Sequence, residues 1–150
     1  MVTSPIHQKS LVIVRQVCSA IMRLLLDTHV FLWYISADPL LPVAFRNAIR
    51  EPANEVYLSV ASVWEAVVKY SLKKLPLPEA PAEYLPRQRQ AHRIASLPVE
   101  EAALAYLANL PSLHRDPFDR LLIAQAMQHG LTLVTVDDAV RAYLVPLLPH

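Results

Sequence analysis

The sequence contains few of the residues that form cross-links, tight turns and charged surfaces. Among its 150 residues there are one cysteine, Cys18, and one glycine, Gly130, and charged side chains make up only 18%. A single cysteine excludes a disulfide within the chain and is typical of a reducing compartment, so we expect a cytoplasmic protein. Turns and helix ends must rely largely on the thirteen prolines instead.

The chain also lacks a strong charge and a long hydrophobic run. Its formal net charge is +1, although hydrophobic residues reach 54%. Any binding of nucleic acid must therefore come from local clusters of charge. No apolar run approaches the roughly eighteen residues that a membrane-spanning helix needs, so no membrane association is expected. The apolar surplus fills either a generous core alone or a core and an exposed face that a partner covers.

The first 21 residues are expected to lie outside the domain. They contain basic residues and a short apolar run, as a secretion signal does, but Arg15 interrupts that run after four residues. A strand-like segment begins directly after Met22. The sequence therefore predicts an extension or leader over residues 1–21 and one domain over residues 22–150, with Met22 as the natural start.

Short apolar segments alternate with helical patterns along the rest of the chain. Strands are predicted at residues 23–26, 55–59, 131–137 and 143–148. Helices are predicted over residues 29–35, 42–51 and 60–75, after Pro81, within 96–110 behind a short extended piece, over 116–130, and as a turn or short helix over 137–143. This order predicts an α/β fold with a mainly parallel sheet, whose sites lie at the carboxyl ends of the strands.

Four acids are expected to meet at that edge of the sheet. Asp27 and Asp137 each end a strand, Glu65 lies six residues past Ser59, the predicted N-cap of the next helix, and Asp119 lies in a helical first turn. Carboxylates repel one another at close range, so such a cluster favours a multivalent cation. Oxygen donors alone select Mg²⁺ or Mn²⁺ over zinc. The pattern predicts metal-assisted cleavage of a phosphodiester, with one ion or with two ions about 4 Å apart.

Each acid taken alone also has a purely structural explanation. Asp27 could be only an N-cap, Glu65 a solvent-facing helical acid, and Asp119 an acid that stabilises a helix N-terminus. Asp116 and Asp138 are typical of caps, and neither is predicted to be a primary ligand. Only the combination of the four points to a site.

Four segments together carry a family pattern: LLLDTHVFLW, LSVASVWEAVVKYSLKKLPL, HRDPFDRLLIAQA and LTLVTVDDAV. In this order they resemble the PIN-domain family, and more narrowly its VapC-type toxins, from about Met22 to the C-terminus. The resemblance implies a three-layer α/β/α sandwich, an endoribonuclease that depends on Mg²⁺ or Mn²⁺, a homodimer, and inhibition by a cognate antitoxin. Matched by position, the catalytic and metal-binding acids of the family fall on Asp27, Glu65, Asp119 and Asp137, and its small hydroxylic residue falls on Thr135.

A local basic surface is the candidate for holding RNA. Between residues 69 and 93, six basic side chains outnumber two acidic ones, a local net charge of +4. The candidate phosphate contacts are Lys69, Lys73, Lys74, Arg87, Arg89, Arg93 and Arg115. Any one of them could equally belong to a solvated helix face. Arg120, beside the third acid, could offset carboxylate repulsion, contact the scissile phosphate, or form a structural ion pair.

The remaining features concern partners and alternatives. Trp33, Tyr34 and Trp64 could stack on bases but are more typical of cores and interfaces. His29 and His114 are interpreted as local hydrogen-bonding or rim residues rather than as metal ligands or general bases. Residues 31–45 and 73–77 are candidate faces for the dimer partner and for an antitoxin helix.

Two other hypotheses remain open: a housekeeping PIN nuclease without an antitoxin, and a non-catalytic RNA- or protein-binding module on the same fold.

Overall fold

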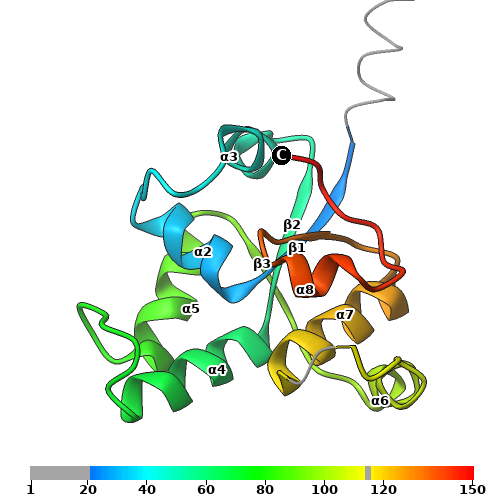
Figure 1. Ribbon diagram of the computed structural model, residues 1–150. Coiled ribbons are helices and arrows are strands. Elements are labelled where there is room, and N and C mark those ends of the chain that lie inside the picture. The colour runs from blue at the N-terminus through cyan, green and yellow to red at the C-terminus, as the bar shows by residue number, and fades with distance from the viewer. Residues whose placement is uncertain (1–20, 114–115) are drawn as a thin grey trace, which may run out of the picture.

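The computed structural model describes residues 21–113 and 116–150 (Figure 1). The predicted leader, apart from Ile21, lies outside the described residues. His114 and Arg115 also lie outside them.

Four short strands form one parallel sheet in the order β3-β2-β1-β4. They are β1 (Arg23–Leu26), β2 (Glu55–Ser59), β3 (Ala95–Leu97) and β4 (Thr132–Val134). In the central strand β1, three consecutive leucines are completely buried. Such a run without alternation is typical of a parallel strand that is covered on both faces. The predicted α/β fold with a mainly parallel sheet is confirmed.

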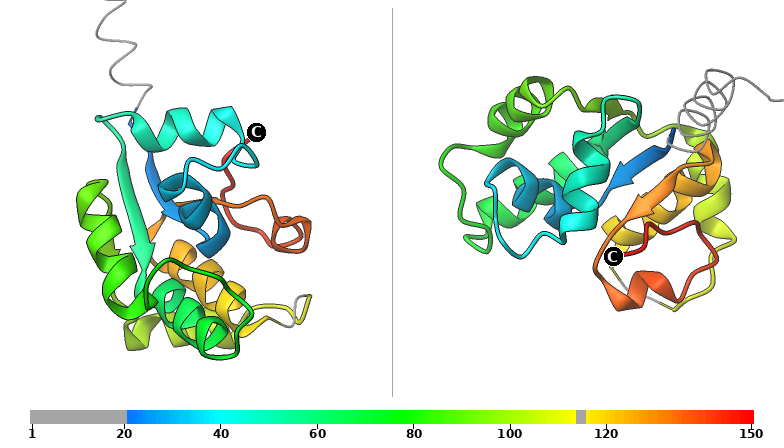
Figure 2. Two further views of the ribbon diagram at one scale, coloured as in Figure 1. Left: turned by 90° about the vertical axis from the view of Figure 1, so that its left-hand side faces the viewer. Right: turned by 90° about the horizontal axis from the view of Figure 1, so that it is seen from above.

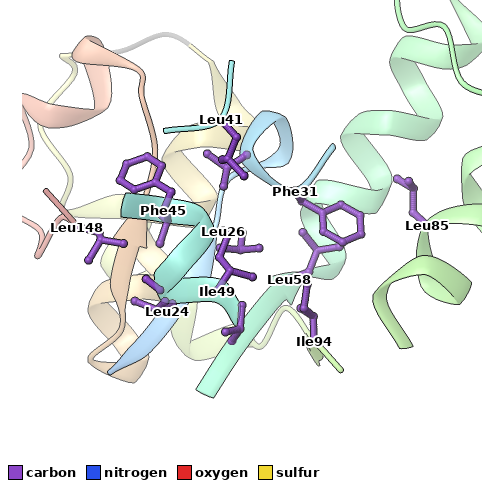
Figure 3. Close-up of a cluster of buried hydrophobic side chains, with 14 of the residues drawn as sticks. Leu24, Leu26, Phe31, Leu41, Phe45, Ile49, Leu58, Leu85, Ile94 and Leu148 are labelled. Atoms are coloured by element: carbon purple, nitrogen blue, oxygen red, sulfur yellow. The ribbon is translucent and has the colours of Figure 1, made fainter. Parts of the chain in front are cut away.

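Helices cover both faces of this sheet. On one face, Leu24 and Leu26 pack with side chains of α2 (Thr28–Ile35), α3 (Val43–Arg50) and α5 (Pro81–Ala91), among them Phe31 and Phe45 (Figure 3). On the other face, Leu25 packs with side chains of α6 (Glu101–Ala108) and α7 (Pro117–His129). Seen from above, α3 lies in front of the strands and α7 behind them (Figure 2). The three-layer sandwich is therefore confirmed.

The connecting helices begin and end where the sequence predicts polar caps and glycine. Ser59 ends β2 and caps α4 (Val60–Ser71), accepting a hydrogen bond from the Ala61 N–H at 3.0 Å. Asp116 caps α7 directly before Pro117, and α7 ends at Gly130 with a φ of 63° in the left-handed region. No helix in the described part of the chain is long and apolar enough to cross a membrane.

The structure differs from the sequence-based expectation at several elements. The strand predicted over residues 131–137 spans only Thr132–Val134, so Asp137 lies three residues past the end of β4. The helix predicted to reach residue 75 ends at Ser71, and Lys73 adopts a φ of 58° in the turn that follows. Pro42 is the N-cap of α3 rather than part of its first turn. The strand predicted over residues 143–148 is wrong, since this segment forms only an isolated bridge from Leu147 to Leu133 after the short helix α8 (Asp138–Arg141). Pro146 has no N–H to extend the pairing.

Candidate active site

A small polar pocket lies at the carboxyl ends of β1 and β4, where α2, α4, α7 and α8 converge in the centre of Figure 1. Its volume is about 200 Å³. The lining residues of this acid pocket are Asp27, Thr28, His29, Glu65, Lys69, Asp116, Asp119, Val136 and Asp137. All four predicted acids therefore line one pocket, although they come from four different parts of the chain.

The sheet register brings Asp27 beside Thr135. Leu26 pairs with Val134 in the β1–β4 ladder, so the next residues on the two strands are also neighbours, and the Asp27 N–H donates to the Val134 carbonyl at 3.0 Å. The Asp27 Oδ1 accepts from the Val30 N–H at 2.8 Å and caps α2, while Oδ2 accepts from the Thr135 hydroxyl. Thr135 Oγ1 also accepts from the Asp137 N–H at 3.1 Å, so one hydroxyl ties the first acid to the fourth.

Glu65 is buried and held at both of its carboxylate oxygens. Its Oε1 accepts from the Thr28 hydroxyl at 2.6 Å, and its Oε2 pairs with the ammonium of Lys69, one helical turn further along α4. Ser59 starts α4 at the end of β2, and this fixed start places Glu65 over the first turn of α2. The alternative explanation of Glu65 as a solvent-facing helical acid is wrong, because Glu65 is only 3% exposed.

The remaining carboxylates lie at helix starts. Asp116 Oδ1 accepts from the Phe118 and Asp119 N–H groups at 2.9 and 3.3 Å, which places Asp119 in the first turn of α7. Asp137 Oδ1 accepts from the Ala139 N–H at 2.9 Å and caps α8. Helix N-termini carry partial positive charge, so these positions reduce the repulsion among the acids.

Burial and charge shift the pKa values of two groups in this pocket. Burial raises the pKa of Asp27, although the hydrogen bonds from Thr135 and Val30 act against this, and the charge of Glu65 raises it further. Burial acts against the charged form of Lys69, but its bond to Glu65 and the charges of Asp116 and Asp119 prevail and raise its pKa. The pocket thus disfavours a charge on Asp27 and favours one on Lys69.

A second, larger pocket shares His29 with the acid pocket. This apolar pocket has a volume of about 370 Å³ and lies between α2, the turn after α4 and α5. It is lined by His29, Leu32, Trp33, Ile35, Ser36, Asp38, Leu75, Pro76, Leu77, Pro78 and Tyr84. Side chains from the two predicted partner faces, residues 31–45 and 73–77, thus line the same pocket.

Comparison with known proteins agrees with this architecture. The family model of the PIN domain matches residues 24–143, which is most of the chain. This chain belongs to the PIN-domain family. It is 31% identical over 123 residues to the ribonuclease VapC22 of Mycobacterium tuberculosis, a match that covers 81% of this chain and 92% of that protein.

Two solved structures of other proteins show the same fold. VapBC2 of Rickettsia felis, bound to a DNA fragment from its promoter, matches with a TM-score of 0.63 and 18% identity over 85% of this chain and 98% of that chain. FitAcB of Neisseria gonorrhoeae matches with a TM-score of 0.55 and 24% identity over 84% of this chain and 96% of that chain. At these identities the likeness supports the fold alone.

The predicted basic residues do not lie together on this PIN domain. Lys69 lines the acid pocket, whereas Lys73 and Lys74 lie exposed in the turn after α4. The other predicted contacts are placed as follows: Arg87 pairs with Glu79, Arg89 donates to the Ile94 carbonyl at 2.9 Å, and Arg93 is exposed with a φ of 56°. The structure therefore brings one of the described candidates, Lys69, to the acids.

Arg120 has a structural environment despite its position beside the third acid. Its guanidinium donates to the Pro111 carbonyl at 2.8 Å and to the Tyr143 hydroxyl at 3.1 Å. These bonds connect the loop before α7 with the segment after α8. Arg120 does not contribute to the lining of the acid pocket.

The sequence did not predict the contacts that two residues of the pocket make with the second acid. Thr28 was left without a role, yet its hydroxyl holds the second acid. Lys69 was grouped with surface cations, yet it pairs with that same acid. Its spacing of four residues from Glu65 on one helix was the available signal, because such residues lie on the same face.

The donors of the acid pocket fit a hard divalent cation. PIN-domain nucleases generally depend on divalent metal ions. The candidate ligands here are all carboxylate oxygens, the donors that such ions prefer. As the side chains stand, no three histidine, cysteine or carboxylate groups of the described residues are gathered closely enough to enclose an ion. Asp27 and Glu65 are bonded to protein donors instead, so an ion must share these carboxylates with their partners or replace some of them.

Proposed function

We propose that this chain is the toxin of a VapBC-type toxin–antitoxin pair and that it acts in the cytoplasm as an endoribonuclease dependent on Mg²⁺ or Mn²⁺. The observation that carries the proposal is the meeting of four acids at one strand-end pocket of a PIN domain. The 31% sequence identity to a VapC ribonuclease, over most of both chains, supports the same activity.

The residues proposed to hold the metal are Asp27, Glu65, Asp119 and Asp137. When bound, a divalent ion lowers the pKa of a water molecule and stabilises the charge that develops on the scissile phosphate. The chain contributes the orientation of the acids. Thr135 and the start of α2 hold Asp27, and Thr28 holds Glu65, so little side-chain freedom is lost when an ion binds.

The RNA is proposed to enter at the C-terminal end of α4 and along the exposed turn that follows it. Lys69 lies at the acid pocket, and Lys73 and Lys74 follow in the exposed turn next to it. Their charges attract the phosphates on either side of the cleaved bond, whereas the acids alone would repel them.

Cleavage by matched variants tests this function. Wild type, Asp27→Asn and Asp138→Asn are expressed briefly, and the new RNA ends are sequenced. Asp138 is the control, because it is exposed beside Asp137 and does not line the acid pocket. We expect specific new ends with wild type and with Asp138→Asn, and their loss with Asp27→Asn. Purified wild type should cleave in Mg²⁺ or Mn²⁺ and stop in EDTA. Equal cleavage by Asp27→Asn would contradict the site assignment.

The apolar pocket is the proposed binding site of the antitoxin. Its lining is mostly apolar and it shares His29 with the acid pocket, so a segment bound there also limits access to the acids. Co-expression with the antitoxin encoded beside the gene tests this placement. Trp33→Ala should keep cleaving RNA but escape neutralisation, whereas unchanged neutralisation would move the antitoxin elsewhere.

The outer face of α4 is the proposed homodimer surface. Val60, Trp64 and Val67 recur at helical spacing and are 46%, 57% and 37% exposed. The Trp64 ring stands edge-on to Phe118 of α7, with centroids 4.8 Å apart, which widens this face. Sedimentation of wild type and Val67→Glu tests it. We expect a dimer and a monomer respectively, and a dimer for both would exclude this face.

A further inference from the structure

The acid pocket contains a cation that belongs to the chain itself. Lys69 pairs with Glu65 and lines the same pocket as all four proposed ligands. We propose that the ammonium group of Lys69 is a built-in counter-ion, which pairs with Glu65 in the metal-free protein and competes with the divalent ion for that carboxylate. This inference rests on the proposed function, because it assumes that a metal binds there.

The geometry gives Lys69 access to the second acid. Lys69 follows Glu65 by four residues on α4, so the two side chains lie on one face of the helix. The side chain of Glu65 is 4% exposed, while that of Lys69 is 33% exposed. The ammonium therefore enters the pocket from its rim, and its flexible stem can withdraw towards solvent.

Both oxygens of Glu65 already have protein donors. Thr28 donates to Oε1 at 2.6 Å and Lys69 donates to Oε2. Each of these oxygens keeps a second lone pair, but a divalent ion bound at Oε2 would lie close to the positive ammonium of Lys69. Thr28 is 5% exposed and neutral, whereas Lys69 is half-buried and repelled by a second cation, so Lys69 is the group that leaves.

The charge balance of the pocket explains why such a counter-ion is present. Among the residues that the structure describes, five carboxylates and one lysine, Lys69, line the pocket, and no arginine does. Besides Glu65, Asp116 and Asp119 also stabilise the charged ammonium. Without it, the acids of the metal-free protein would repel one another with less compensation. With Lys69 present, binding of a divalent ion replaces one cation at Glu65 by another.

Metal binding by charge variants tests the exchange. Wild type, Lys69→Met, Lys69→Arg and Arg50→Met are freed of metal and titrated with Mn²⁺ alone by calorimetry. Lys69→Met keeps most of the stem and removes the charge. Arg50, exposed at the end of α3 and outside the acid pocket, is the matched loss of one positive charge elsewhere. Lys69→Met should bind Mn²⁺ about tenfold tighter or more, because a neighbouring positive charge is gone. Lys69→Arg and Arg50→Met should stay within about threefold of wild type.

Thermal unfolding in EDTA supplies a second measurement. Lys69→Met should melt below wild type without metal and gain more from Mn²⁺ than wild type does. If Lys69→Met does not fold without metal, Lys69→Gln is measured in the same way, and a larger Mn²⁺-dependent rise in Tm than in wild type supports the exchange.

The possible outcomes separate this inference from the proposed function. Equal or weaker Mn²⁺ binding by the uncharged variants overturns the competition and leaves Lys69 as an orienting or structural partner of Glu65. In that case wild type still binds Mn²⁺ and still cleaves RNA. If wild type itself binds no Mn²⁺, the proposed function and the inference fail together.

Discussion

The two ends of strand β1 carry charge in opposite ways. At its start, Arg23 pairs with Glu55 of β2 at 2.9 Å, and the two side chains are 47% and 56% exposed. Directly after its end, Asp27 is 9% exposed and lies in a pocket with Glu65. The two positions are four residues apart in the sequence, yet one pair is surrounded by water and the other group of charges lies where four helices converge.

The difference shows where charge affects stability and where it affects chemistry. Water screens the pair at the start of β1, and such surface pairs contribute little to stability. At the end of β1, the protein must hold like charges together with hydrogen bonds from other elements, such as those from Thr135 and Thr28. The same arrangement is what a divalent cation can bind.

Loss of one carboxylate at the buried end should have the largest effect. Asp119→Asn keeps the size of the side chain and removes a charge from the first turn of α7. RNA cleavage in saturating Mg²⁺ should fall by about a thousandfold. Single-turnover rates of wild type, Asp119→Asn and Asp138→Asn measure it. A loss smaller than about tenfold would remove Asp119 from the proposed ligands.

Removal of a donor from a buried carboxylate should have the next largest effect. Thr28→Val keeps the shape of the side chain but removes the hydrogen bond to Glu65. The free energy of unfolding should fall by about 1–2 kcal/mol. Urea denaturation of Thr28→Val beside Thr132→Val measures it, since Thr132 is half-buried at the start of β4 and does not line the acid pocket. Equal losses of unfolding free energy in both variants would mean that the hydrogen bond from Thr28 to Glu65 adds no stability beyond that of an ordinary threonine.

Neutralising Asp27 should stabilise the metal-free protein. Burial raises the pKa of Asp27, so the folded state binds its proton more tightly than the unfolded state does. In Asp27→Asn the new amide has no charge to bury and its oxygen can still cap α2. The free energy of unfolding in EDTA near pH 7 should therefore be higher for Asp27→Asn than for wild type.

The same pKa shift predicts the pH dependence of that gain. As pH falls through the raised pKa of Asp27 towards its ordinary value, the wild-type carboxyl takes up its proton and the wild type recovers stability, so the advantage of Asp27→Asn should shrink. Denaturant unfolding of both proteins from pH 7 to pH 4 measures it. A constant difference across this range would contradict the raised pKa.

The exposed end of β1 should show the smallest effect. Arg23→Gln removes the pair with Glu55 and a bond to the His129 carbonyl. Because this pair is solvated, the free energy of unfolding should fall by no more than about 0.5 kcal/mol, and this loss should become smaller in high salt. Cleavage should stay at the wild-type rate. A larger loss of stability would mean that the two ends differ less than their exposure indicates.

Much of the fold and of the acid pocket follows from local rules of sequence. Parallel strands end at one edge, so acids placed after two strands had to lie near each other. Ser59 and Gly130 marked helix boundaries through their capping chemistry. These predictions need only residue type and spacing.

What could not be predicted depends on the direction of side chains and on contacts between distant segments. The contact of Thr28 with Glu65 is set by the distance between α2 and α4, which no local pattern gives, whereas the pairing of Lys69 with Glu65 follows their spacing of four residues on α4. The two partner faces were predicted separately, and only the packing of α2 against the turn after α4 joins them in one pocket. The C-terminal strand failed because Pro146 limits the segment to a single bridge.

The capping of helices by the acids has a consequence for mutational escape. Asp27 and Asp137 are proposed ligands and also accept backbone N–H groups at the starts of α2 and α8. Alanine or valine at these positions removes both roles, whereas asparagine retains a cap acceptor. Cells under selection to silence this toxin should therefore yield two kinds of allele. The asparagine variants should still fold and still bind the proposed antitoxin. In a cell that also carries an intact copy of the gene, such an inactive variant would compete for the antitoxin and leave more of the active toxin uninhibited.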